Sequence, residues 1–507
     1  MNPLGPWTFF CTGRFRSCMR SSPKPSAGSS EARSQYRHFF LILIGAVLVF
    51  VGLVAVFVLA MHYKRDADKA AKERRYRRSF LPYMDDAEGT LASAQAALLE
   101  AGEDVLANAR NRVRTSKAFL DRIIAQFPDY PEAHRMRGRL FLFLREFDDA
   151  DSDFDAYQRL IGDDHKLVYF DRSNGAALRT LREATLEPPM DLLLTGGAKR
   201  AKELHAYLDW VQDTTRLEND KMVDLNKVMY AKSLLHFFSG ELHDAAWGLD
   251  AAEYFRADDP LVYALMAVCH LYETTEPTPS ETPPLQRAET AIAAGLKLSQ
   301  HVPELWGIRG VLDLRSGRAK AAAEAFERAI RLDPSYFQAL TGLGRALHAM
   351  GRAKEAASML TDALDGEKAS GASRSWLIRL ARARAHAAVF RAADEPEAAR
   401  EKHMTEALAD LAAAEELDRS RGEVVTERSS LYAEKNQLDR ALKELDRFLN
   451  VHTGNLEVRL CRAELRLRAG QNAGAREDVE RLENMLKEGG LPIDPRIAEL
   501  KKRLQEK

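Results

Sequence analysis

A group of residues in this chain recurs at a spacing of 34 positions. Glycine and alanine pairs carry the recurrence: Gly310 and Gly344, Gly317 and Gly351, Ala322 and Ala356, and Ala329 and Ala363. A fixed period of this length is typical of stacked copies of one small supersecondary unit, in which each copy contacts only its neighbours. The spacing therefore predicts a repeat array over most of the 507 residues, rather than a single globular core.

The clearest copy covers residues 303–336 and has the pattern of two helices joined by a turn. Pro303 begins the first helix, where its missing N–H costs nothing, and Gly317 ends that helix. Ala322, Phe326 and Ala329 then line one face of the second helix at spacings of four and three. Two helices this short cannot bury their apolar faces alone, so they must stack on neighbouring copies.

This order of an aromatic residue, Gly, a turn Gly, Ala, Phe, Ala and Pro resembles the tetratricopeptide repeat. Residues 303–336 match nearly every signature position, with Arg309 where the family favours Leu, and 337–370 match well, with Lys368 in place of the closing Pro. Fainter copies follow the same frame at 131–164, 226–259, 422–455 and 456–489. Two more units, which begin at Pro260 and near Ser373, are interrupted by insertions at 274–284 and around 391–402. The resemblance implies an all-α, right-handed superhelical solenoid of helix–turn–helix repeats.

The segments outside the clear repeats are expected to be mostly helical. In chain order we expect a disordered basic tail (1–37), a transmembrane helix (38–62), a basic juxtamembrane segment (63–84), N-terminal repeat-like helices (85–164), a non-canonical helical segment (165–222), degenerate repeats with a Pro-rich insertion (223–302), two clear repeats (303–370), degenerate repeats (371–489) and a capping helix (490–507). The sequence leaves open whether 165–222 is a degenerate repeat or a separate element.

An uncharged apolar run from Phe39 to Met61 predicts the transmembrane helix. Its 23 residues would span about 34 Å as a helix, against a hydrocarbon core of about 30 Å. Eight Lys and Arg follow the run within 64–78, and four precede it within 20–38. This asymmetry favours a single-pass cell (inner) membrane protein of bacterial type with cytoplasmic repeats. A periplasmic repeat domain remains the alternative. With the repeats in the cytoplasm, the basic N-terminal tail would have to be moved across the membrane, which its positive charge disfavours.

The charge balance and the motifs argue against nucleic acid binding and against catalysis. Residues 1–80 carry a net charge of +10 and residues 81–507 a net charge of −11, which disfavours a phosphate backbone as ligand of the repeats. The chain has no Gly-x-x-x-x-Gly-Lys-Ser/Thr loop, no His-Glu-x-x-His, no Gly-x-Ser-x-Gly and no Cys-x-x-Cys. His236 and His243 are better explained as ordinary helix residues than as ligands. We therefore expect no enzyme activity, cofactor, metal or small-molecule substrate.

The remaining functional surface is the inner face of the solenoid. The resemblance implies that the first helix of each repeat lines a concave groove that holds a peptide or helix of a partner protein. The groove candidates are Arg135, Arg139, Glu304, Gly307, Val311, Arg315, Gln338, Thr341, Arg345, His348, Glu464 and Arg468. Among them Arg139, Arg315 and Arg345 are candidates to pair with carboxylates of a ligand. The alternative, which the sequence favours for any single one of these arginines, is an ordinary solvated position on a helix surface.

The sequence thus predicts a membrane-anchored scaffold that binds other proteins through the groove. The alternative is a regulatory or assembly factor that controls a membrane enzyme or an envelope-biogenesis complex. One dominant enzyme partner in a crosslinking experiment would favour the regulator, and a multi-component complex would favour the scaffold.

Overall fold

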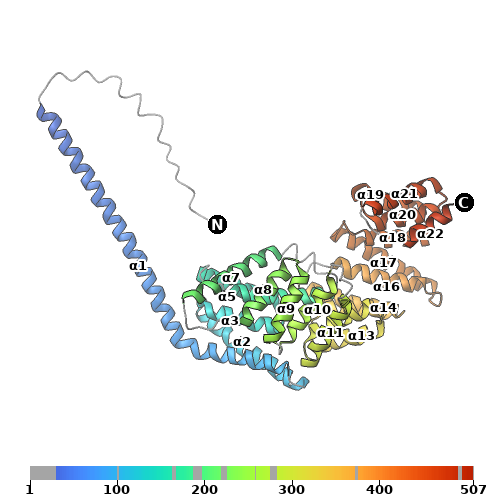
Figure 1. Cartoon of the computed structure of the whole chain (residues 1–507), viewed down its shortest axis with the longest axis horizontal. Helices are drawn as coiled ribbons and strands as arrows, with labels where there is room; N and C mark the ends of the chain where they lie inside the picture. The colour runs from blue at the N-terminus through green and yellow to red at the C-terminus, as the bar shows by residue number, and fades with distance from the viewer. Residues whose placement is uncertain are drawn as a thin grey trace. The chain divides into compact units, whose positions relative to one another are not determined.

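The computed structural model describes residues 30–99, 102–162, 167–186, 197–217, 225–256, 259–273, 282–370, 375–488 and 494–505 (Figure 1). In these ranges the regular elements are helices, and no strand occurs. The chain divides into two units, Met1–Leu81 and Pro82–Lys507. All contacts described below lie within the second unit.

Helix α1 covers Ser30–Ala97, so the backbone is helical through the predicted membrane and juxtamembrane segments. The side chains of residues 30–53 lie outside the described ones, as does the whole of 1–29. Within the part of the chain that is described, no helix combines the length and the apolar character needed to cross a membrane. The transmembrane helix at 38–62 therefore stays a prediction.

The second unit continues as a series of helices, most of which pack in antiparallel pairs on their neighbours in the chain. They are α2 (Glu103–Gln126), α3 (Pro131–Leu144), α4 (Phe147–Ile161), α5 (Leu167–Glu183), α7 (Ala198–Leu217), α8 (Leu225–Phe238), α9 (Leu242–Arg256), α10 (Pro260–Tyr272), α11 (Pro284–Leu298), α12 (Pro303–Arg315), α13 (Ala319–Leu332), α14 (Phe337–Ala349), α15 (Ala353–Ser370), α16 (Ser375–Arg391), α17 (Glu397–Leu417), α18 (Gly422–Glu434), α19 (Leu438–Val451), α20 (Leu456–Arg468), α21 (Asn472–Glu488) and α22 (Pro495–Gln505). The all-α repeat architecture is confirmed.

The ring of Phe326 explains why two positions of consecutive first helices are glycine, Gly310, which recurs 34 residues later as Gly344, and Gly342. This ring is fully buried between α12 and α14. A Cβ atom added at Gly310 would lie 2.6 Å from this ring, and one at Gly342 would lie 2.4 Å from it. Only glycine lets both first helices approach the ring this closely, so these positions set the distance between consecutive repeats.

The apolar core follows the solenoid and changes in size along it. One large cluster of buried side chains extends from Phe141 in α3 to Ala385 in α16. Three smaller clusters follow, the first from Trp376 to Leu431, the second from Val425 to Leu465 and the third from Leu460 to Leu504. Each of the smaller clusters is built by three consecutive helices, as expected for a stack in which repeats contact their neighbours.

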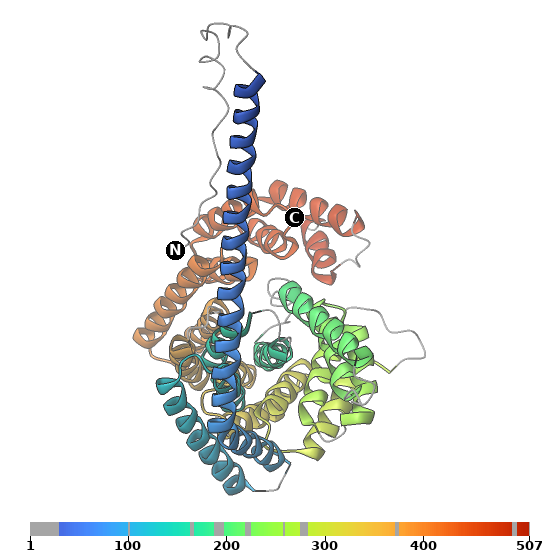
Figure 2. The ribbon, with the colours of Figure 1, turned by 90° about the vertical axis from the view of Figure 1, so that its left-hand side faces the viewer.

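Helix α5 departs from this simple stacking. It packs against α3 and α4, which precede it, and also against α10, α12 and α14, which begin 77 or more residues after it ends. Side chains on nearly all of its faces are buried. Figure 2 shows the later helices curving round this segment. The non-canonical segment 165–222 therefore contains a separate element that lies along the inner face of the repeats.

Candidate protein-binding cleft

Two of the predicted groove residues hold α5 in place. Glu304, on α12, is fully buried and accepts hydrogen bonds from Arg145 Nε at 2.8 Å, Arg145 Nη2 at 3.0 Å and Arg182 Nε at 3.1 Å. Gln338, on α14, donates through Nε2 to Glu183 Oε1 at 3.1 Å. At these two repeats the inner face is thus occupied by the chain's own helix.

The charges at this contact depend on one another. Burial disfavours the charged form of Glu304, but the attraction of Arg145 and Arg182 outweighs it and lowers the pKa of the carboxyl to about 2. Arg182 also pairs with Asp333, and its guanidinium lies 4.5 Å from the centre of the Tyr336 ring. Because these side chains are buried, removal of one would leave an uncompensated charge inside the protein.

A cleft of about 640 Å³ opens where α5 ends. Its walls come from α12, α14, α16 and the start of α18, together with the ends of α5 and α10. The lining residues are Leu186, Tyr272, Val311, Leu314, Arg315, Arg345, His348, Ala349, Trp376, Leu377, Leu380, Ala381, Arg384, Arg421 and Glu423. Four of them (Val311, Arg315, Arg345 and His348) are groove candidates from the sequence, and the structure brings them together.

Positive charge exceeds negative charge in this cleft, because four arginines line it and Glu423 is the one acidic lining residue described. Arg315 donates to the Leu271 carbonyl at 2.7 Å and lies 4.3 Å from the centre of the Tyr272 ring. Arg345 donates to the Leu186 carbonyl at 2.9 Å. Among the described residues, neither of these two guanidinium groups forms an ion pair, although Glu423 attracts Arg345 from a greater distance.

The other two arginines have acidic neighbours. Arg421 pairs with Asp418 at 2.7 Å and Arg384 approaches Glu427 at 3.4 Å. The guanidinium of Arg421 also lies 4.3 Å from the centre of the Trp376 ring. The cleft therefore combines cations with aromatic faces.

The pKa shifts agree with an excess of positive charge. Burial lowers the pKa of Arg345, with a smaller contribution in the same direction from Arg384 and Arg315. Burial, followed by repulsion from Arg384, also lowers the pKa of His348. The Nδ1 atom of His348 is buried without a hydrogen-bond partner among the described residues. A ligand with carboxylate groups would supply the missing charge and an acceptor.

Comparison with known proteins identifies the repeat. Residues 313–387 match the family model of the tetratricopeptide repeat. This part of the chain contains tetratricopeptide repeats. The match includes α14 and most of α16, and thus the part of the array that carries Arg345, His348 and Arg384.

Solved structures of tetratricopeptide proteins are similar in fold. A tetratricopeptide repeat protein from Parabacteroides merdae is 16% identical, with 55% of this chain and 98% of that chain covered and a TM-score of 0.42. Yeast Tom70 is 12% identical, with 86% of this chain and 94% of Tom70 covered and a TM-score of 0.38. Human IFIT1, solved as a dimer with m7Gppp-AAAA, is 12% identical, with 78% and 86% covered and a TM-score of 0.46. The search of curated proteins found no match.

The remaining predicted groove residues lie elsewhere on the helical array. Arg135 donates to Asp171 of α5 at 2.7 Å, and Arg139 lies 3.2 Å from Glu88 and 3.9 Å from Asp171. Gly307 leaves room for Tyr336 and Thr185. The hydroxyl of buried Thr341 donates to the Phe337 carbonyl of its own helix at 3.0 Å. Glu464 and Arg468 lie on α20 and do not line the cleft.

Eleven of the fifteen lining residues were not among the sequence candidates, and Trp376, Arg384 and Arg421 are the most important of these for the charge and the aromatic character of the cleft. They lie on α16 and just before α18, in the unit where an insertion interrupts the 34-residue frame. This unit is degenerate, so the sequence assigns no position on α16 to the inner face. The alternation Arg382-Ala383-Arg384-Ala385 was visible, but Arg382 turns away and pairs with Asp410 at 2.7 Å.

Proposed function

We propose that this chain is a membrane-anchored scaffold whose cleft binds an acidic segment of a partner protein. The observation that carries the proposal is that Arg315 and Arg345 line a cleft beside α5 without an ion-pair partner among the described residues. Guanidinium groups form bidentate hydrogen bonds with carboxylates, and partial burial strengthens such pairs relative to the protein surface.

The apolar part of the cleft restricts the partner further. Trp376 and Tyr272 are buried and present ring faces beside the arginines. A suitable segment therefore combines Asp or Glu side chains, or a C-terminal carboxylate, with at least one large apolar residue. The rings would bury that residue and the arginines would hold the charge, so the two features together give affinity and orientation.

The proposed membrane anchor rests on the apolar run at 39–61 and its basic flanks. An anchor would hold bound partners near the bilayer and raise their effective concentration there. Alkaline carbonate extraction of membranes that contain the full chain tests this part. The chain should stay in the membrane pellet, and its release into the supernatant would contradict the anchor.

The cleft itself can be tested with two synthetic peptides of equal length on the full chain in detergent. One carries Glu, Asp, Leu and Phe, and the other has Gln and Asn in place of the acids. We expect the acidic peptide to bind more tightly, with fluorescence anisotropy as the measurement. Arg384→Gln, which alters a side chain 44% exposed, should weaken binding about tenfold, and Arg345→Met should weaken it at least as much.

Arg331→Met provides the matched control, because Arg331 is 59% exposed on α13 and does not line the cleft. Equal affinity for the two peptides, or equal affinity in Arg384→Gln and the control, would show that the cleft is not the binding site. A competing RNA oligonucleotide should not displace the peptide. Displacement would argue that the ligand is a nucleic acid instead.

A further inference from the structure

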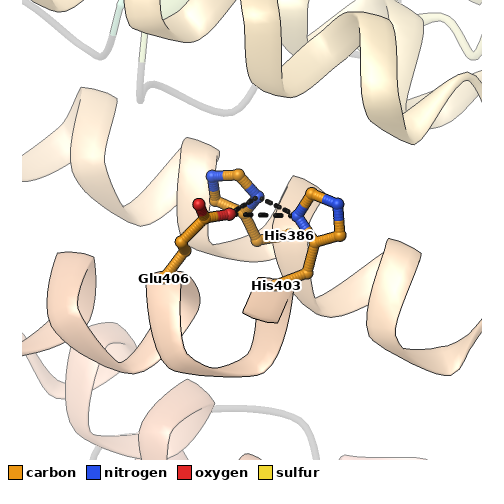
Figure 3. A group of neighbouring side chains, drawn as sticks. All are labelled: His386, His403 and Glu406. Atoms are coloured by element: carbon orange, nitrogen blue, oxygen red, sulfur yellow. Dashed lines mark hydrogen bonds and ion pairs between the residues drawn. The ribbon is translucent and has the colours of Figure 1, made fainter. Parts of the chain in front are cut away.

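Three potential metal ligands converge between α16 and α17, on the side of α16 that faces its partner helix. His386 comes from α16, and His403 and Glu406 lie one turn apart on α17. Figure 3 shows the two rings and the carboxylate directed toward a common point. The histidine side chains are 12% and 20% exposed, so the site is largely shielded from water.

The distances suit a tetrahedral metal ion. His386 Nδ1 lies 2.9 Å from His403 Nδ1 and 3.4 Å from Glu406 Oε2, and His403 Nδ1 lies 3.1 Å from Glu406 Oε2. Zinc binds imidazole nitrogen and carboxylate oxygen at about 2.0–2.2 Å, which separates two tetrahedral ligands by about 3.3 Å. The three atoms therefore already form one face of such a tetrahedron to within a few tenths of an ångström.

Hydrogen bonds among the three groups cannot satisfy all of these atoms. A neutral imidazole carries one ring proton and a carboxylate carries none. The two Nδ1 atoms and Glu406 Oε2 form a triangle. If only one Nδ1 carries a proton, one of the three atom pairs can be a hydrogen bond, and at least one other pair brings two lone pairs together. With a proton on both Nδ1 atoms, two N–H groups point at each other. Consistent with this, Glu406 Oε2 is buried without a hydrogen-bond partner among the described residues.

Nearby cations do not neutralise the carboxylate at the point of convergence. Lys402 approaches the other oxygen, Oε1, at 3.8 Å and is 73% exposed. Arg382 is engaged with Asp410 through two hydrogen bonds of 2.7 and 2.8 Å. Glu406 Oε2 is thus left directed at the two rings.

The site depends on the insertion that interrupts the repeat. Helix α17 has 21 residues, whereas α13, the corresponding helix of the clear repeat, has 14. Both helices end before an aspartate whose Oδ1 accepts the backbone N–H two residues later at 3.0 Å, Asp418 in one case and Asp333 in the other. The extra residues therefore lie at the start of α17, and His403 is the last of them.

We propose that His386, His403 and Glu406 form a zinc site that clamps α16 to α17. Two imidazole nitrogens and one carboxylate oxygen are a donor set that zinc favours, and the fourth position of the tetrahedron is left for water. The clamp holds α16, the helix that carries Trp376 and Arg384 of the cleft.

Titration of the full chain tests the site. The chain is purified in detergent without a histidine tag, stripped with EDTA and titrated with ZnCl₂ against a chromophoric chelator. We expect one tight zinc equivalent per chain that depends on these residues. CoCl₂ in place of zinc should give the intense visible absorption of tetrahedral Co²⁺.

Variants of the ligands locate the site. His403→Gln and Glu406→Gln keep side-chain size and polarity, and each should weaken zinc binding at least about tenfold. His236→Gln is the matched control, since His236 belongs to a second, more exposed group with Glu241 and Asp244 at the α8–α9 turn. It should bind zinc as the unchanged chain does.

Three results would overturn the proposal. They are no zinc equivalent bound in competition with the chelator, equal binding by His403→Gln and the unchanged chain, or loss of binding in His236→Gln alone. Circular dichroism of each variant accompanies the titration. If His403→Gln loses helix content, Glu406→Gln, whose altered side chain is 37% exposed, decides the result.

Discussion

At the scale of single residues, the repeat is maintained by close contacts that a methyl group would disturb. Phe326 fills the space between two glycines of consecutive first helices, and Gly138 and Gly344 meet Phe154 and Leu360 in the same way, with Cβ distances of 2.6 and 2.5 Å. The glycines recur because the aromatic or aliphatic side chain opposite them recurs. The glycine and the large side chain opposite it are both needed to keep the distance between neighbouring helices the same from repeat to repeat.

Gly342→Ala should therefore destabilise the protein. The new Cβ would lie 2.4 Å from the buried Phe326 ring, and such overpacking costs about 1–3 kcal/mol of unfolding free energy. Urea unfolding followed by circular dichroism measures the change. Gly89→Ala, on α1, is the control, because no described atom lies within 4 Å of the added Cβ. A Gly342→Ala variant as stable as the control would show that the ring yields at little cost.

At the scale of elements, α5 is the feature that distinguishes this array from a simple stack. Its polar end is fixed by Arg182 and Glu183, which reach Glu304, Asp333 and Gln338 of two later repeats. The side chains of Arg182 and Arg145 are only 5% and 11% exposed. The position of α5 on the inner face therefore depends on the carboxylate of Glu304.

Glu304→Gln should cost about 3–5 kcal/mol, because it leaves two buried guanidinium groups with less compensation. It should also change the pH dependence. The pKa of Glu304 is lowered in the folded protein to about 2, so the unfolded chain binds more protons and stability is lost as pH falls from about 5 toward 2. The variant should lack this part of the loss.

Urea unfolding at several pH values, with hydrogen exchange of the α5 amides, measures both effects. Glu324→Gln is the matched control, as Glu324 is exposed on α13. The same pH dependence in Glu304→Gln and in this control would contradict a stabilising role for the carboxylate.

At the scale of the whole array, Pro82–Lys507, the buried apolar side chains form separate cores, and each core contributes its own share of the stability. The large cluster around α5 involves helices far apart in the chain, whereas the clusters after α16 involve only neighbours. Linear stacks of this kind lose cooperativity, so the C-terminal repeats should open independently of the centre.

Leu445→Ala tests this division. Leu445 is fully buried in the cluster from Val425 to Leu465, and its truncation should cost about 2–5 kcal/mol locally. Hydrogen exchange should accelerate in α18–α20 and stay unchanged in α10–α14, with Lys443→Ala, an exposed position of the same helix, as control. Equal acceleration in both regions would mean that the array unfolds as one unit.

The sequence alone determined the fold class and the repeat, because the period of 34 and the glycine and alanine pattern are local consequences of helix packing. It also placed Arg315, Arg345 and His348 on the inner face, since their register follows from the clear repeats. The apolar run at 39–61 is also a local property of the sequence. The membrane anchor that it predicts therefore does not depend on how the repeats fold.

Only the tertiary structure decided what occupies the inner face. The pairing of Arg182 with Glu304 joins residues 122 positions apart, and no periodicity links them. His403 reaches His386 of α16 because α17 is extended at its start, and His403 is part of that extension. A repeat pattern predicts which residues stack, but contacts across the curve of the superhelix depend on the summed rotation of many repeats.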